Sequence, residues 1–192
     1  MSILPNGYKD PTAGGNYMKL EKGENKFRIL NNPIFGWETW VDDKEGNRKP
    51  LRKREEEPFD LIKDEVTDES SIKYFWAMIV WNHQLEKVQI LEITQKGIRK
   101  AIEALDRSKD WGDAKEYDIV ITREGDGFDT EYSVMPVKPA PLTKEMAQAF
   151  AKSNINLDAL YDGLDPFITP VKMDVPKTKE EQDDRFDNPD NI

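Results

Sequence analysis

The first half of the chain alternates polar and apolar residues in two short stretches, which an Asn-Asn-Pro sequence separates. Residues 26–30 and 34–41 each show the two-residue period of a β-strand, so we predict one long strand that bends at Pro33. Gly36 lies inside the second stretch, where an isolated glycine predicts a β-bulge. Residues 42–72 are charged, contain prolines and have no sustained period. They are predicted to form a loop, and a loop of that length in a compact domain is usually functional or disordered.

Two hairpins with a helix between them are predicted in the middle of the chain. Residues 73–82 and 86–94 are rich in aromatic and β-branched residues and flank a short turn, which predicts the first hairpin. The helix that follows is expected to have Thr94 as its N-cap. Its apolar residues recur at helical spacing: Ile98, Ile102 and Leu105. Residues 117–122 and 130–137 flank a turn that contains glycines, and they predict the second hairpin.

The C-terminal part is predicted to be helical and then disordered. Thr143 is expected to cap a helix, and a shorter helical segment is expected to end near Gly163. Their apolar residues should pack on the sheet or form a contact between protomers: Met146, Phe150, Leu157, Leu160 and Tyr161. From Asp165 onward prolines and acids dominate, which predicts disorder. Residues 1–22 are rich in Gly, Pro, Asn and Lys, and they are predicted to be an arm rather than a strand.

The order of these elements indicates a mainly β fold. A long strand, a loop, a hairpin, a helix and a second hairpin follow one another, which is the chain order of the OB-fold. That fold is a five-stranded Greek-key barrel that binds oligonucleotides, here with one helix between the third and fourth strands. We therefore expect four parts: a flexible N-terminal arm over residues 1–22, an OB-fold domain over 23–141, C-terminal helices over 142–164, and a disordered acidic tail over 165–192.

The composition indicates a folded centre with solvated ends. The chain has 192 residues, with 28 Lys and Arg against 38 Asp and Glu, a formal net charge of −10. The length favours one domain. The absence of cysteine excludes a disulfide scaffold, thiolate metal ligands and a cysteine nucleophile. No apolar run approaches the roughly 20 residues that span a bilayer, and residues 1–7 lack the features of a signal peptide, so we expect a cytoplasmic protein without a membrane partner.

Charge is concentrated in two segments of opposite sign. Residues 44–54 contain six bases and one acid, a sum of +5, whereas residues 180–192 contain six acids and one base, a sum of −5. The basic segment falls in the predicted loop between the first two strands, and OB-folds bind oligonucleotides with that loop. Three glutamates at residues 55–57 follow at once. Two opposite patches on a solvated loop are therefore an alternative explanation.

Residues 74–81 are all apolar, so both faces of this predicted strand are apolar. Only one of the two faces can point into a small barrel. The other face must be covered by another element, a partner or a flat apolar ligand. Nucleobases are such a ligand, because stacking on an aromatic ring contributes roughly 1 to 3 kcal/mol per base with any sequence. We expect Tyr74 and Trp76 to stack bases, together with whichever of Trp37 and Trp40 faces the ligand. Basic side chains in or near this region are the expected phosphate contacts: Arg28, Lys49, Arg52, Lys53, Arg54 and Lys73.

The sequence contains no motif of an enzyme or a cofactor site. Phosphate-binding loops, dinucleotide-binding glycine patterns and nucleophile elbows are all missing. His83 is the only histidine and has no second ligand of its type nearby, so we expect it to have neither a metal nor a catalytic role. The glycines at residues 125–127 depart from the spacing of a calcium loop and fit a hairpin turn. We therefore expect a non-enzymatic protein that needs no cofactor and no metal.

Several segments resemble the single-stranded DNA-binding proteins of tailed bacteriophages. The resemblance covers about residues 20–140 and is a pattern of spaced aromatic and basic residues. It lies in the following segments: residues 22–30, 33–40, the basic segment, 74–82, 89–93 and 130–134. It implies an OB-fold that coats single-stranded DNA in phage replication, recombination or repair, in the cytoplasm of the host cell. Some relatives hold zinc through cysteine and histidine, which this chain without cysteine cannot do.

The resemblance also implies that the acidic C-terminal tail docks replication or recombination proteins. The candidate partner-binding residues lie in that tail: Asp183, Asp184, Phe186 and Asp187. Physical reasoning adds that an acidic segment can occupy the basic groove of its own chain and leave it when DNA binds. The alternative is an end that increases solubility and has no partner.

A protein of a different class would fit the same net charge. An acidic interaction module, or a DNA mimic, would use its negative surface to occupy a partner's DNA site and would bind no nucleic acid itself. Removing the −5 of residues 180–192 from the total of −10 leaves −5 on the rest of the chain. Saturable, salt-sensitive binding to a homopolymeric single strand distinguishes the two classes. The oligomeric state, the number of nucleotides covered and the preference for DNA over RNA do not follow from the sequence.

Overall fold

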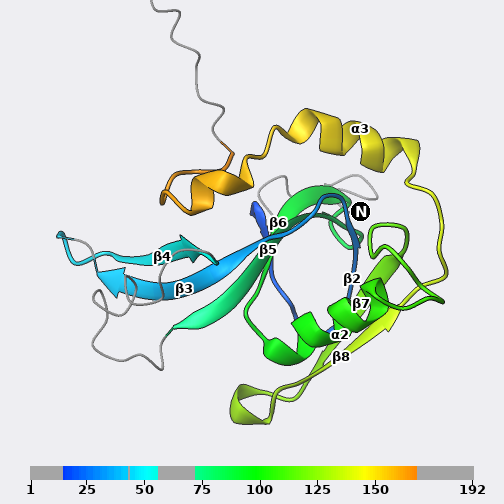
Figure 1. Cartoon of the computed structure of the whole chain (residues 1–192), viewed down its shortest axis with the longest axis horizontal. Helices are drawn as coiled ribbons and strands as arrows, with labels where there is room; N and C mark the ends of the chain where they lie inside the picture. Colours follow the sequence, from blue (N-terminus) through cyan, green and yellow to red (C-terminus); the bar gives the residue numbers. More distant parts are fainter. Residues whose placement is uncertain (1–14, 43, 56–71, 168–192) are drawn as a thin grey trace, which may run out of the picture.

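The computed structural model describes residues 15–42, 44–55 and 72–167. The described residues form one sheet of eight strands with two α-helices (Figure 1), so the prediction of a mainly β fold is confirmed. The strands are β1 (Tyr17–Met18), β2 (Gly23–Ile29), β3 (Ile34–Asp42), β4 (Arg48–Arg54), β5 (Lys73–Asn82), β6 (Lys87–Ile93), β7 (Asp118–Glu124) and β8 (Glu131–Pro136). The helices are α2 (Lys96–Asp106) and α3 (Lys144–Ser153), with the 3₁₀ helices η2 (Gly127–Asp129) and η3 (Leu157–Leu160).

The strands follow the order β1-β6-β5-β2-β7-β8, and β3 pairs with β5 and with β4. β2 and β3 lie end to end along β5 and are both antiparallel to it, which confirms the prediction of one long, bent strand. The bend is hydrogen-bonded, because the Leu30 N–H donates to the Ile79 carbonyl (2.9 Å) and the Asn31 side chain accepts from the Ile79 N–H (2.7 Å). Both predicted hairpins are present as β5–β6 and β7–β8.

The basic segment is a strand, so the prediction of a loop is wrong for residues 48–54. β4 is antiparallel to β3 in a continuous register from Gly36 opposite Arg54 to Asp42 opposite Arg48. That register also excludes the predicted bulge at Gly36. A Cβ at this position would lie 2.0 Å from the Lys53 carbonyl oxygen, so the glycine permits the close approach of β4. Residues 43 and 56–71 of the predicted loop lie outside the described part of the chain.

Two buried apolar clusters stabilise the sheet, one on each side of β5. One lies inside the curve of the sheet, where Phe27, Met78 and Ile119 pack against α2. The other lies on the opposite side of β5, where Met146 and Leu160 from α3 and η3 pack on the sheet (Figure 1). The second apolar face of β5 is therefore covered by another element of the same chain, which was one of the three predicted alternatives. Its residues in this cluster are Phe75, Ala77, Ile79 and Trp81.

Three predicted boundaries change, two of them through long-range contacts. The N-cap of α2 is Gln95, without a side-chain hydrogen bond, whereas Thr94 was predicted. Within the predicted arm, β1 forms a parallel pair with Ile90 and Leu91 of β6. At the start of the predicted tail, the Phe167 ring contacts Tyr17 edge-on with centroids 5.8 Å apart. The N-cap at Thr143 is confirmed, because its side chain accepts from the Met146 N–H.

Among the described residues, no helix is both long and apolar enough to cross a bilayer.

Candidate nucleic-acid interface

Four aromatic side chains share one face of β3 and β5. They lie where β3, β4 and the start of β5 extend away from the rest of the sheet (Figure 1). Side chains alternate between the two faces of a strand, so Phe35 and Trp37 lie on the same side of β3. They are opposite Trp76 and Tyr74 of β5 in the strand register. We call these four residues the aromatic face.

Tyr74 lies at the centre of the aromatic face. Its ring is stacked beside Phe35, with centroids 6.4 Å apart and planes at 29°, and it meets Trp37 edge-on at 5.1 Å and 76°. Phe35 is 41% exposed, and Trp37, Tyr74 and Trp76 are half-buried. The face therefore has exposed ring surface on which flat apolar groups can stack.

Arg99 of α2 adds a cation to this face. Its guanidinium carbon lies 4.9 Å from the centroid of the Tyr74 ring, a cation–π contact. Burial lowers the pKa of Arg99, and its Nε has no hydrogen-bond partner among the described residues. An arginine stays charged in proteins, so this side chain remains a donor beside the rings. Lys53, opposite Trp37 in the register of β3 and β4, lies on the same side of the sheet.

One acid lies at the edge of the aromatic face. Burial, together with a hydrogen bond to Glu55, raises the pKa of Tyr74 to about 12. Tyr74 is therefore protonated at neutral pH and its hydroxyl donates to the carboxylate. The charge of Glu55 opposes any anion that approaches the rings from this side.

Two of the predicted phosphate contacts point to the other side of the sheet, which we call the arginine face. Arg52 is 6% exposed, and it donates to Glu38 (2.7 Å) and to Glu92 (2.9 Å). Arg54 forms an ion pair with Asp158 (3.1 Å), and its guanidinium lies over a tyrosine ring of the C-terminal segment. The structure therefore does not bring Arg52 and Arg54 together with the aromatic face.

A third predicted phosphate contact, Arg28, is also inside the protein. Its Nε donates to Asp118 (2.7 Å) and one of its terminal nitrogens donates to the Ala140 carbonyl (2.9 Å). Lys26 and His83 contact the same carboxylate. Burial raises the pKa of Asp118, but the electrostatic interaction with His83 and the hydrogen bonds from Lys26 and Arg28 lower it below its ordinary value.

Three of the remaining predicted residues are exposed: Trp40, Lys49 and Lys73. Trp40 is 48% exposed, but it lies at the alternate position to Trp37, so Trp37 is the tryptophan of β3 that joins the aromatic face. Lys49 is exposed and lines a groove with Tyr17. Lys73 is exposed at the start of β5. The predicted partner-binding residues lie outside the described part of the chain: Asp183, Asp184, Phe186 and Asp187.

Sequence reasoning missed two residues of this site. Phe35 could have been found, because it has the same alternation as Trp37 on the predicted strand. No sequence pattern indicates Arg99, because only the tertiary structure brings this residue of α2 to the Tyr74 ring. Within residues 15–42, 44–55 and 72–167, no group of three His, Asp or Glu side chains could hold a metal ion.

Comparisons of the chain with protein-family models, with curated proteins and with solved structures found no match.

Proposed function

We propose that this chain is a non-enzymatic, sequence-tolerant single-stranded DNA-binding protein that acts in phage DNA replication, recombination or repair. The observation that supports it most is the aromatic face with Arg99 over Tyr74. Aromatic rings bind the flat surfaces of bases, and neighbouring cations bind phosphates, without reading a sequence. Replication or recombination proteins remain the proposed partners of the acidic tail.

We also propose that the sheet is an OB-fold. The pairing order β6-β5-β2-β7-β8, with α2 between β6 and β7 in the chain, supports it. An OB-fold binds oligonucleotides on the face of its second and third strands. With β2 and β3 counted as the first strand and β1 and β4 left out, β5 and β6 take those places in the chain order. Tyr74 and Trp76 belong to β5, on the side of the strand that they share with Met78 of the inner cluster.

The test is a titration of a dye-labelled dT homopolymer, followed by fluorescence anisotropy. Trp37→Ala should weaken binding by about 1 to 3 kcal/mol, the contribution of one stacked base. Trp40→Ala is the matched control, because Trp40 is exposed on the opposite face of the same strand. Equal affinities for both variants would contradict the aromatic face as the site, and an absence of binding at low salt would contradict the function.

Salt dependence gives a second measurement. Arg28, Arg52 and Arg54 have carboxylate partners, so we expect only two or three phosphate contacts. A plot of log affinity against log salt concentration should then have a slope of about −1.4 to −2.1, from roughly −0.7 per contact on a single strand. A steeper slope would mean that the paired arginines exchange their carboxylates for phosphates.

The second candidate is an acidic interaction module, or DNA mimic, that binds no nucleic acid. The net charge of −10 favours it, and so does the pairing of those three arginines with acids. This candidate predicts no anisotropy change with the homopolymer at any salt concentration. It also predicts that the chain competes with DNA for the site of a basic partner.

A further inference from the structure

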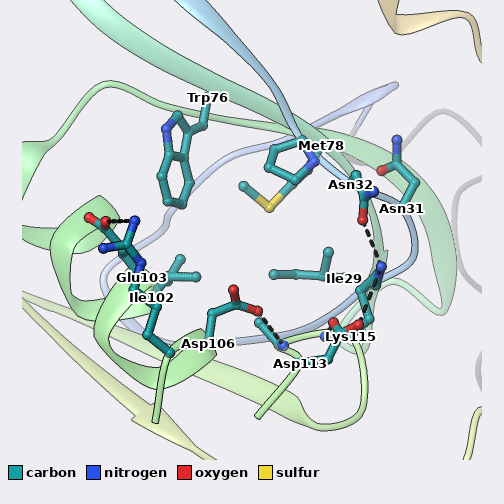
Figure 2. A pocket seen from close by; sticks show the side chains of 13 residues that line it. Ile29, Asn31, Asn32, Trp76, Met78, Ile102, Glu103, Asp106, Asp113 and Lys115 are labelled. Atoms are coloured by element: carbon teal, nitrogen blue, oxygen red, sulfur yellow. Dashed lines mark hydrogen bonds and ion pairs between the residues drawn. The ribbon is translucent and has the colours of Figure 1, made fainter.

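A cavity of about 270 Å³ adjoins the aromatic face. It lies between the bend that joins β2 to β3, the middle of β5, the second half of α2 and the residues before β7 (Figure 2). Its inner surface is apolar and buried, and is made by Ile29, Met78 and Ile102. The indole of Trp76 forms one wall, so the cavity and the aromatic face share a ring (Figure 2).

Three carboxylates line the cavity, and among the described residues only two of them have an ion-pair partner. Glu103 forms an ion pair with Arg107 (2.8 Å), and Asp113 forms one with Lys115 (3.4 Å). Asp106, in contrast, makes no ion pair with a described residue. One of its oxygens accepts from the Ala114 N–H (2.9 Å), and the carboxylate is directed into the cavity (Figure 2). The second oxygen is therefore placed to accept a hydrogen bond from a group inside the cavity.

The lining favours a base over a phosphate. Three carboxylates and two cations line the cavity, so its local charge is negative and would repel an anion. An aromatic wall, apolar side chains and one acceptor match a flat heterocycle that presents a donor. A carboxylate accepts hydrogen bonds from the exocyclic amine of cytosine, whereas thymine presents a carbonyl oxygen at the corresponding position.

We propose that this cavity holds one unstacked base of the bound strand and favours a base with an exocyclic amine, cytosine above all. The base stacks on Trp76, and its amino group donates to Asp106. This inference rests on the proposed DNA-binding function and adds a bias to a site that otherwise tolerates any sequence. Thymine binds there less well, because its O4 faces a carboxylate.

The test compares the affinities of dC, dU and dT homopolymers of equal length at one salt concentration. The full-length protein should bind dC about tenfold more tightly than dT, as expected for one specific base contact. Uracil lacks both the amine of cytosine and the methyl group of thymine, so dU should bind like dT. If dU instead bound like dC, the methyl group would cause the difference and the role of Asp106 would be wrong.

The variant Asp106→Asn sharpens the test, because its amide oxygen can keep the bond from the Ala114 N–H. Its amino group would then face the cavity and donate to thymine O4, so the preference for dC should disappear or reverse. Asp110→Asn is the matched control, since Asp110 is exposed like Asp106 and carries the same charge but does not line the cavity. Thermal unfolding of both variants checks that they are folded.

The outcomes separate this inference from the proposed function. Equal binding of dC and dT by the unmodified protein, or an unchanged preference in Asp106→Asn, would overturn the base pocket and leave DNA binding intact. Failure of every homopolymer to bind would overturn the DNA-binding function and the pocket with it. The comparison of homopolymers uses the unmodified protein, so it remains decisive even if the variant does not fold.

Discussion

The two faces of the sheet formed by β3, β4 and β5 differ in what their side chains contact. On the aromatic face, Phe35 is exposed beside Tyr74, and Arg99 lies over the tyrosine ring. On the arginine face, Arg52 is buried between two carboxylates, and Arg54 contacts Asp158. Both faces therefore combine arginines with aromatic rings, but on the arginine face the charges are neutralised within the chain.

The difference shows that a run of basic residues is not the same as a basic surface. Arg52, Lys53 and Arg54 are consecutive in the sequence, but the alternation of a strand places Lys53 on one face and the two arginines on the other. The arginines then stabilise carboxylates that would be costly to bury alone. The cation over the Tyr74 ring instead comes from Arg99 of α2, which is distant in the sequence.

Arg52→Ala should have the largest effect, because it leaves Glu38 and Glu92 without their shared cation. Removing one partner of a buried ion pair costs about 3 to 5 kcal/mol. Urea denaturation followed by circular dichroism would measure the loss. Arg48→Ala, in an exposed position of the same strand, should change the free energy of unfolding by less than about 0.5 kcal/mol. Similar values for the two variants would mean that the arginine face does not stabilise the fold.

Asp118→Asn extends the comparison to Arg28, the third predicted phosphate contact that has a carboxylate partner. It should cost about 1.5 to 3 kcal/mol at pH 7, because Arg28 is buried and loses a charged acceptor. The folded-state pKa of Asp118 is lowered, so its contribution is complete above its unfolded pKa of about 4. The contribution is lost as the pH falls through the lower, folded-state pKa.

Unfolding free energies of the unmodified protein and Asp118→Asn, measured from pH 7 to pH 2, would test this. The two curves should converge at low pH, where both side chains are neutral. The groups that face Asp118 are Lys26, Arg28 and His83, and all three favour its charged form. A difference that grew as the pH fell would contradict the ion pair as its source.

Gly36→Ala tests whether the two faces depend on the close contact of β3 with β4. The added Cβ would lie 2.0 Å from a backbone oxygen of β4, so the strand must move. We expect a loss of about 1 to 3 kcal/mol in the free energy of unfolding, the usual cost of overpacking. Gly97→Ala in α2 is the control, since its Cβ meets nothing within 4 Å. That control should be neutral or slightly stabilising.

The smallest expected effect comes from a matched pair of arginines, each over a tyrosine ring. Arg99 lies over Tyr74 and Arg54 lies over Tyr161, but only Arg54 has a carboxylate partner among the described residues. Arg99→Gln should make the salt slope of DNA binding shallower by about 0.7, one phosphate contact. Arg54→Gln should leave the slope unchanged. The reverse result would assign DNA binding to the arginine face.

Much of the fold could be predicted because its signals are local. The two hairpins, the long bent strand and the helix between the hairpins each follow from a period of two or 3.6 residues over a short stretch. The strand β4 was missed for a reason that is also physical. Its residues are mostly basic, and a charged strand becomes recognisable only when the partner that neutralises it is known, here Glu38 and Glu92.

The sequence by itself determined which side chains were candidates for the site: the aromatic residues of β3 and β5 and the basic residues near them. Only the tertiary structure decided which of them act together. Strand alternation and pairing placed Trp37 with Tyr74 and excluded Trp40, and packing brought Arg99 of α2 to the rings. The physical reason is that periodicity depends on neighbouring residues, whereas burial and charge pairing depend on contacts between segments that are far apart in the chain.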